Sequence, residues 1–110
     1  VLDDTTVAWL PAAFAPTSQD EIRRRFPDAV EASAADAAVL GLNAVSDGHH
    51  VVLPAQAERL AADLDAHGFE PVPIDLSELL RAGGGPKCCT MELRPARATE
   101  LRPTTTDEVR

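Results

Sequence analysis

The sequence predicts an α/β chain in which β-hairpins and single helices alternate. Short apolar runs rich in β-branched residues are bounded by turn residues, which is typical of strands, and other segments carry apolar residues at helical spacing. The predicted strands are too short and irregular for a doubly wound parallel sheet. One stretch, 39–74, has the order strand–strand–helix–strand and predicts a modular unit.

The first part of the chain predicts two short strands with a helix between them. The strands cover 5–10 and 29–31. The helix begins with a capping box, in which Ser18 is the N-cap and Glu21 reaches back to it. Pro27 ends the helix, because proline cannot continue a helical hydrogen-bond pattern.

A hairpin follows. The alanine-rich stretch 34–38 is too short to be assigned to helix or strand on composition. Beyond it, apolar runs over 39–45 and 49–53 flank the turn sequence at 46–48. An Asp-Gly step between apolar runs predicts a hairpin, because glycine accepts a positive φ.

The strongest helix signal follows this hairpin. Its apolar residues share one face, and Gly68 ends the helix. The members of this face are Ala57, Leu60, Ala61 and Leu64. The next strand, 69–74, contains Pro71 and Pro73, so we predict an edge or irregular strand.

The end of the chain predicts a short helix, a glycine-rich turn, a strand and a tail. Residues 75–78 cap the helix and Gly83 terminates it. After three consecutive glycines, the run 87–93 predicts a final strand. Residues 94–110 carry prolines, threonines and mixed charges, so we expect a domain over 1–93 and a disordered tail over 94–110.

Length and charge limit what this protein is. A chain of 110 residues supplies one small domain or part of a larger one, and it starts with Val1 rather than Met, so we expect a piece of a longer protein. The net charge of −8, with no basic stripe among aromatic residues, argues against nucleic-acid binding. No apolar run approaches the roughly 20 residues that span a membrane.

Two cysteines carry the candidate chemistry. Adjacent cysteines such as Cys88 and Cys89 form a disulfide only with strain, so we expect a reduced, cytoplasmic protein. The chain's only lysine, Lys87, favours the thiolate form of Cys88, which would then be a nucleophile presented after a flexible loop. The alternative is a pair of small buried residues in a strand, and spacing alone does not separate the two.

Other polar residues have simpler interpretations. The three histidines, His49, His50 and His67, are expected to be solvated or structural. The arginines at 23–25 predict a solvated helix face, and Asp75 and Glu78 are better explained by capping than as a catalytic pair. Adjacent cysteines lack the spacing of a zinc motif, so neither a metal site nor a cofactor is predicted.

Three segments together resemble the C-terminal part of the dimethylarginine dimethylaminohydrolases. They are the run 42–54, the helix to Gly68, and above all the glycine-rich approach to the paired cysteines over 83–93. The resemblance extends over about 1–93. This family belongs to the guanidine-modifying superfamily, with the arginine deiminases and amidinotransferases.

The resemblance implies a fold and a site. The fold is a pentein-like α/β propeller of five strand–strand–helix–strand blades, of which this chain would supply the last one or two. Cys88 matches the family nucleophile, and the backbone near Ala82 and Gly83 matches the contact to the amino-acid end of the substrate. The family's general acid/base histidine and most of its guanidinium-binding carboxylates find no match in this chain.

The implied activity is hydrolysis of guanidino compounds, dimethylarginine or arginine, to citrulline plus amine or ammonia through a covalent thiouronium intermediate. Two alternatives remain open: an amidinotransferase of the same superfamily, and a non-catalytic module that needs a partner chain. The expected partners are a small guanidino substrate and either a second copy or a complementing chain. We expect no catalysis from the isolated 110 residues.

Overall fold

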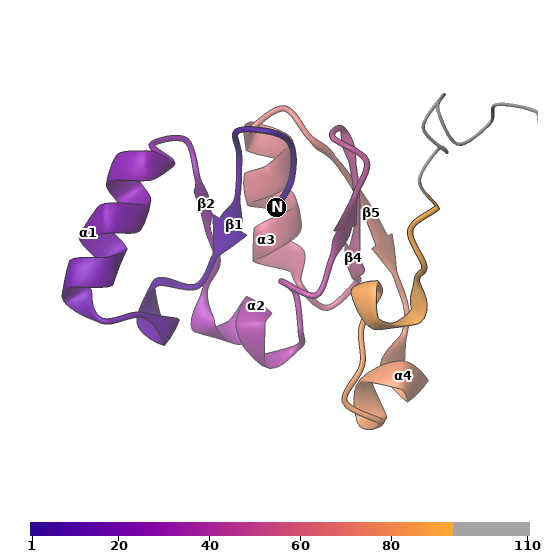
Figure 1. The fold of residues 1–110 in the computed structure, drawn as a ribbon. Helices are drawn as coiled ribbons and strands as arrows, with labels where there is room; N and C mark the ends of the chain where they lie inside the picture. Colours follow the sequence, from indigo (N-terminus) through magenta and orange to yellow (C-terminus); the bar gives the residue numbers. More distant parts are fainter. Residues whose placement is uncertain (94–110) are drawn as a thin grey trace, which may run out of the picture.

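The computed structural model describes residues 1–93. Along the ribbon in Figure 1, a small sheet next to α1 lies at one side, α2 and α3 come in the middle, and the strands β4 and β5 precede α4 at the other side. The predicted α/β class is confirmed. The predicted tail, 94–110, lies outside the described residues.

The first sheet joins two short parallel strands on either side of a helix. Val30 in β2 pairs with Ala8 in β1. The elements of this part are β1 (Ala8–Trp9), η1 (Pro11–Ala13), α1 (Pro16–Arg25) and β2 (Val30–Glu31). The predicted N-cap at Ser18 is wrong, because α1 already begins at Pro16 and has Ala15 as its N-cap. Proline favours the first helical position, since its missing N–H would have had no partner there.

The stretch that composition left unassigned is a helix, α2 (Ala34–Ala38). Ser33 caps it, because its hydroxyl accepts the Asp36 backbone N–H at 3.2 Å. The strand predicted over 39–45 is largely wrong. Val39 ends α2, and the chain turns over the next residues before a strand forms.

The predicted strand–strand–helix–strand unit is present, with a shorter first strand. Its elements are β3 (Val45–Ser46), β4 (His50–Pro54), α3 (Glu58–Ala66) and β5 (Glu70–Ile74). The strand order is β3-β4-β5, with β3 antiparallel and β5 parallel to β4. Gly48 closes the hairpin with a φ of 99°, and the proline-containing β5 lies at the edge of the described sheet as predicted.

The core lies between this sheet and α3. Three members of the predicted apolar helix face, Ala57, Leu60 and Leu64, are fully buried against Val51 and Leu53 of β4. Burial of a leucine or valine side chain stabilises the fold by about 1.5–3 kcal/mol. Alternate residues of β4 and every third or fourth residue of α3 therefore hold the unit together.

The chain then passes through α4 (Ser77–Arg81) and the 3-10 helix η2 (Lys87–Cys89). The strand predicted over 87–93 is wrong. Pro86 adopts a helical conformation, with φ −55° and ψ −43°, and the N–H groups of residues 88–90 bond to carbonyl groups three residues back. Among the described residues, no helix is long and apolar enough to cross a membrane.

Candidate functional site

Cys88 lies in the middle of η2, where its side chain is exposed and makes no disulfide. Cys89 is exposed as well, and its thiol donates a hydrogen bond to the Pro86 carbonyl oxygen at 3.3 Å. Within residues 1–93, the Cys88 thiol has no hydrogen bond to a histidine or a carboxylate. The alternative of two buried cysteines in a strand is therefore wrong.

Asn43 anchors this segment to the rest of the fold. Its side-chain oxygen accepts the Cys88 backbone N–H at 3.2 Å, and its carbonyl oxygen accepts the Lys87 N–H at 3.2 Å. Asn43 itself is held in the turn after α2, because its N–H donates to the Leu40 carbonyl at 2.9 Å. Sequence reasoning gave Asn43 no role. The only signal was a polar residue between Leu42 and Ala44 in an otherwise apolar run.

The glycine-rich turn is needed for two separate reasons. Gly83 has a φ of 81°, which ends α4 in the left-handed conformation. Gly85 is buried, and a Cβ added there would lie 2.7 Å from the Asn43 side-chain oxygen. The backbone before Cys88 can approach Asn43 only because this position has no side chain.

Ala82 and Gly83, which the resemblance assigns to substrate contact, are both exposed at the end of α4. Their backbone N–H groups donate to the carbonyls of Leu79 and Leu80, at 3.0 and 2.9 Å. The N–H groups of Ala82 and Gly83 are therefore both used by the last turn of α4. The backbone groups that these two residues could offer to a ligand are their carbonyl oxygens.

A broad acidic cleft of about 1060 Å³ lies beside η2. Its walls come from the chain start, the β3–β4 turn and the segment around η2, and include Asp3, Asp4, Asp47, Lys87 and Thr90. Backbone N–H groups keep two of these carboxylates ionised. The Thr5 N–H lowers the pKa of Asp3, and the His49 N–H, followed by the His50 side chain, lowers the pKa of Asp47 to about 2. Such a cleft favours cations.

The histidines and the arginines of α1 are exposed to solvent, as predicted. All three histidines are exposed, and His67 Nδ1 lies 2.7 Å from the Asp63 carbonyl oxygen. His49 and His50 meet Glu70 at the start of the sheet. The arginines of α1 form exposed ion pairs, Arg24 and Arg25 with Glu21 and Arg23 with Glu31.

The predicted cap of α4 is confirmed only in part. The Asp75 side-chain oxygen accepts the Ser77 N–H at 3.0 Å directly before α4, but the N-cap residue is Leu76, which makes no side-chain capping bond. Glu78 lies in the first turn of α4 and forms an exposed ion pair with Arg81 at 3.5 Å. These local contacts favour structural roles for both carboxylates.

Sequence comparison identifies curated relatives, one of which is named as an enzyme. Over 95 residues, or 86% of this chain, it is 57% identical to an N(G),N(G)-dimethylarginine dimethylaminohydrolase of Mycobacterium tuberculosis. An uncharacterized protein of Bacillus subtilis, YkgA, is 32% identical over 94 residues, or 84% of this chain. The chain spans 32% of the length of each of these curated relatives. No family model matches the chain.

Solved structures give the same picture. The N-terminal domain of ArgZ bound to product, an arginine dihydrolase from Cyanobacteria, shares 28% identity and a TM-score of 0.71, with 79% of this chain and 33% of that one covered. AgrE in complex with ornithine and NAD+ shares 28% identity and a TM-score of 0.74, over 87% of this chain and 14% of that one. These likenesses confirm a pentein-like α/β fold class and the predicted sequence resemblance.

Proposed function

Because the chain is a sequence relative of a dimethylarginine dimethylaminohydrolase, we propose that it carries the nucleophile, Cys88, of a cysteine-dependent hydrolase of guanidino compounds. The substrate is dimethylarginine or arginine, and the products are citrulline and an amine or ammonia. The identity of 57% over 95 residues carries this proposal. The exposed position of Cys88, anchored through Asn43, supports it.

The proposed chemistry has two steps. The Cys88 thiolate attacks the guanidinium carbon, a C–S bond forms, and the amine leaves with a proton from a general acid. Water then gives one proton to the general base and attacks the thiouronium carbon, so that a C–O bond forms; the C–S bond breaks, the thiolate returns, and loss of the second proton to solvent leaves the neutral ureido product. A solved form of ArgZ covalently bound to a reaction intermediate supports a covalent route.

The other catalytic groups are proposed to come from protein outside these 110 residues. The Cys88 thiol has no hydrogen bond to a histidine or a carboxylate within residues 1–93, which supports a general acid/base supplied by further protein. Val1 and Met91 are 92% and 81% exposed, which supports packing against further protein. We propose that β3, β4, α3 and β5 form one blade of a five-bladed propeller.

Binding of a cationic guanidino substrate is supported by two features: the cleft that Lys87, the neighbour of Cys88, helps to line, and the end of α4. The cleft beside η2 contains carboxylates that stay ionised at neutral pH, and they attract a guanidinium group. The carbonyl oxygens of Ala82 and Gly83 can accept hydrogen bonds from the ammonium group at the amino-acid end. Two exposed thiols without a disulfide fit the reducing cytoplasm that we propose as the location.

Citrulline release by the full-length protein tests the proposal. Wild type, Cys88→Ser and Cys89→Ser are assayed with dimethylarginine and with arginine. We expect Cys88→Ser to lose at least about 10³-fold in kcat, because the covalent step needs the thiolate. Cys89→Ser is the matched control and should retain turnover. Retained amine release by Cys88→Ser would show that Cys88 is not the nucleophile.

The same assay separates the alternatives. Transfer of the amidino group to an added amine, in place of citrulline formation, would identify an amidinotransferase. No turnover and no labelling of Cys88 by a haloacetamidine in the full-length protein would identify a non-catalytic module. The 110-residue chain by itself is expected to be inactive.

A further inference from the structure

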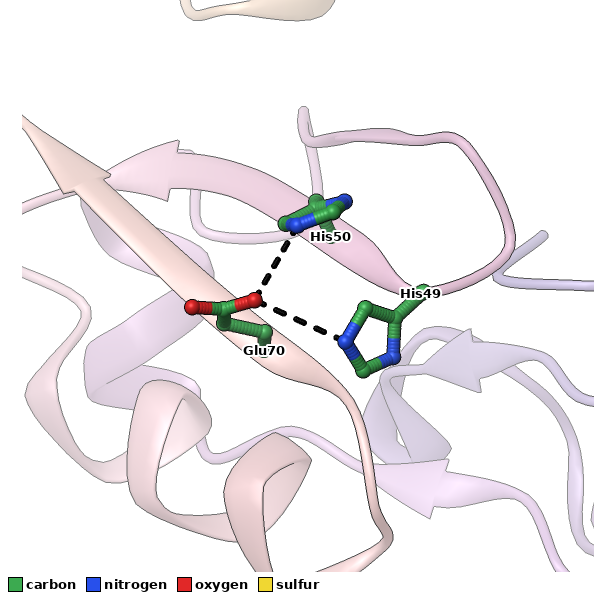
Figure 2. Close-up of side chains that lie close together, drawn as sticks. All are labelled: His49, His50 and Glu70. Atoms are coloured by element: carbon green, nitrogen blue, oxygen red, sulfur yellow. Dashed lines mark ion pairs between the residues drawn. The ribbon is translucent and has the colours of Figure 1, made fainter.

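A cluster of two imidazoles and one carboxylate lies where β4 and β5 begin. Figure 2 shows His49, His50 and Glu70 with their side chains turned toward one another. The Glu70 Oε2 atom is 3.0 Å from His50 Nε2 and 3.5 Å from His49 Nε2. All three side chains are more than half exposed.

The sheet itself brings these residues together. His50 and Glu70 are direct partners in the parallel pairing of β4 with β5, so their side chains leave the sheet next to each other. His49 lies one residue before β4, and its carbonyl accepts the Glu70 N–H at 2.8 Å. Because His49 is outside the strand, its ring does not have to follow the strand's alternation and reaches the same carboxylate.

The three ligand atoms fit the dimensions of a metal site. No two of them are more than 4.8 Å apart. Tetrahedral zinc with bonds of about 2.0–2.1 Å places its ligand atoms about 3.3–3.4 Å apart. The distances from Glu70 Oε2 to the two histidine nitrogens, 3.0 and 3.5 Å, lie on either side of that value. The two histidine ligand atoms lie within 4.8 Å of each other, and small rotations of the exposed rings can shorten that distance.

A second carboxylate fixes the orientation of one ligand. The Asp47 Oδ2 atom lies 2.9 Å from His50 Nδ1, so the opposite ring nitrogen, Nε2, faces Glu70. Asp47 is itself held by the backbone N–H groups of His49 and His50, at 2.9 and 2.7 Å. Metal-binding histidines almost always donate their second nitrogen to such an outer partner, which sets the tautomer and raises the basicity of the ligand.

We propose that His49, His50 and Glu70 bind a divalent transition-metal ion, with Zn²⁺ the best match, and that Asp47 orients His50 from outside. Two neutral imidazoles and a carboxylate are a ligand set that zinc uses with a fourth position open to water. Because the ligands come from both β4 and β5, a bound ion also joins the two strands. An ordinary exposed ion pair is the competing explanation, and it would need no outer carboxylate.

Zinc titration by calorimetry tests this proposal in the full-length protein with both cysteines, Cys88 and Cys89, replaced by serine, since exposed thiols also bind zinc. We expect one saturable site with a stoichiometry of one. The isosteric Glu70→Gln and the ligand-removing His50→Ala should abolish it. Asp47→Asn retains the backbone hydrogen bonds and should weaken zinc affinity by about 10–100-fold. His67→Ala, an exposed histidine outside the cluster, is the control and should bind as the parent does.

Thermal unfolding gives an independent measurement. Saturating zinc should raise the melting temperature of the parent protein and of His67→Ala, because the ion binds only the folded state. It should leave Glu70→Gln unchanged, and this variant decides the result if His50→Ala fails to fold. Absence of saturable binding, binding only at millimolar zinc, or equal affinity in Glu70→Gln and the parent would overturn the proposal.

Discussion

The contact between Gly85 and Asn43 makes Gly85→Ala a direct test of how the Cys88 segment is held. An alanine Cβ at this position would lie 2.7 Å from the Asn43 side-chain oxygen and 3.1 Å from its Cβ. Real Cβ atoms essentially never come closer than 3.0 Å, so the side chain of Asn43 or the segment before η2 has to move. Either movement breaks the hydrogen bond from the Cys88 N–H.

The expected cost combines two terms. Overpacking of a closely packed site costs about 1–3 kcal/mol. Loss of one hydrogen bond adds about 0.5–1.5 kcal/mol. We therefore expect Gly85→Ala to lower the free energy of unfolding by about 1.5–4.5 kcal/mol. Urea unfolding, followed by the fluorescence of the single tryptophan, Trp9, measures this change.

Two controls separate the contact from a general effect of replacing glycine. An alanine Cβ at Gly84 would meet the Leu79 side chain at 3.0 Å and the Leu79 carbonyl oxygen at an ordinary 3.5 Å, so Gly84→Ala should lower the free energy of unfolding by less. Asn43→Ala removes the oxygen that the new Cβ would meet. The double variant Gly85→Ala/Asn43→Ala should therefore lose less free energy of unfolding than the sum of the two single variants. Costs that add within about 0.3–0.5 kcal/mol would refute the reasoning.

Two further predictions concern the core and the cleft. Leu60→Ala removes a side chain that is 1% exposed, and it should cost about 2–5 kcal/mol in urea unfolding. The adjacent exposed Arg59→Ala should stay within about 0.5 kcal/mol, and equal losses would show that α3 does not pack as described. The pKa of Asp3 is lowered, so its contribution to stability is present above the ordinary value of about 3.9 and is lost as the pH falls through the folded pKa. An NMR titration midpoint for Asp3 at or above that ordinary value would contradict the hydrogen bonds from Thr5 and Thr6.

The central unit could be predicted because its signals are local. The Asp-Gly step fixes the hairpin, and the spacing of Leu60 and Leu64 fixes the buried face of α3. The errors occur where local signals compete. The capping box predicted a helix that starts after Ser18, but Pro16 suits the first position of a helix, and α1 begins there.

The site was predictable only in part. Cys88 followed from the family resemblance, but the β-prone run around it gave no sign that Asn43 would hold it in a 3-10 helix. The contact between His50 and Glu70 could not be predicted from the sequence either. These residues are twenty positions apart, and they meet only because β4 pairs with β5. Interactions of this kind depend on register, which a single sequence does not specify.

The hydrogen bond between Asn43 and the Cys88 amide joins residues 45 positions apart, with the whole strand–strand–helix–strand unit between them. Closing a loop of this length costs conformational entropy, and the contacts within that unit have to offset this cost before the bond is stable. We therefore expect the segment that carries the Cys88 thiol to be fixed late in folding. An incompletely folded chain would expose the same sulfur without this hydrogen bond, so protection of the Cys88 amide from hydrogen exchange during refolding would report when the contact to Asn43 forms.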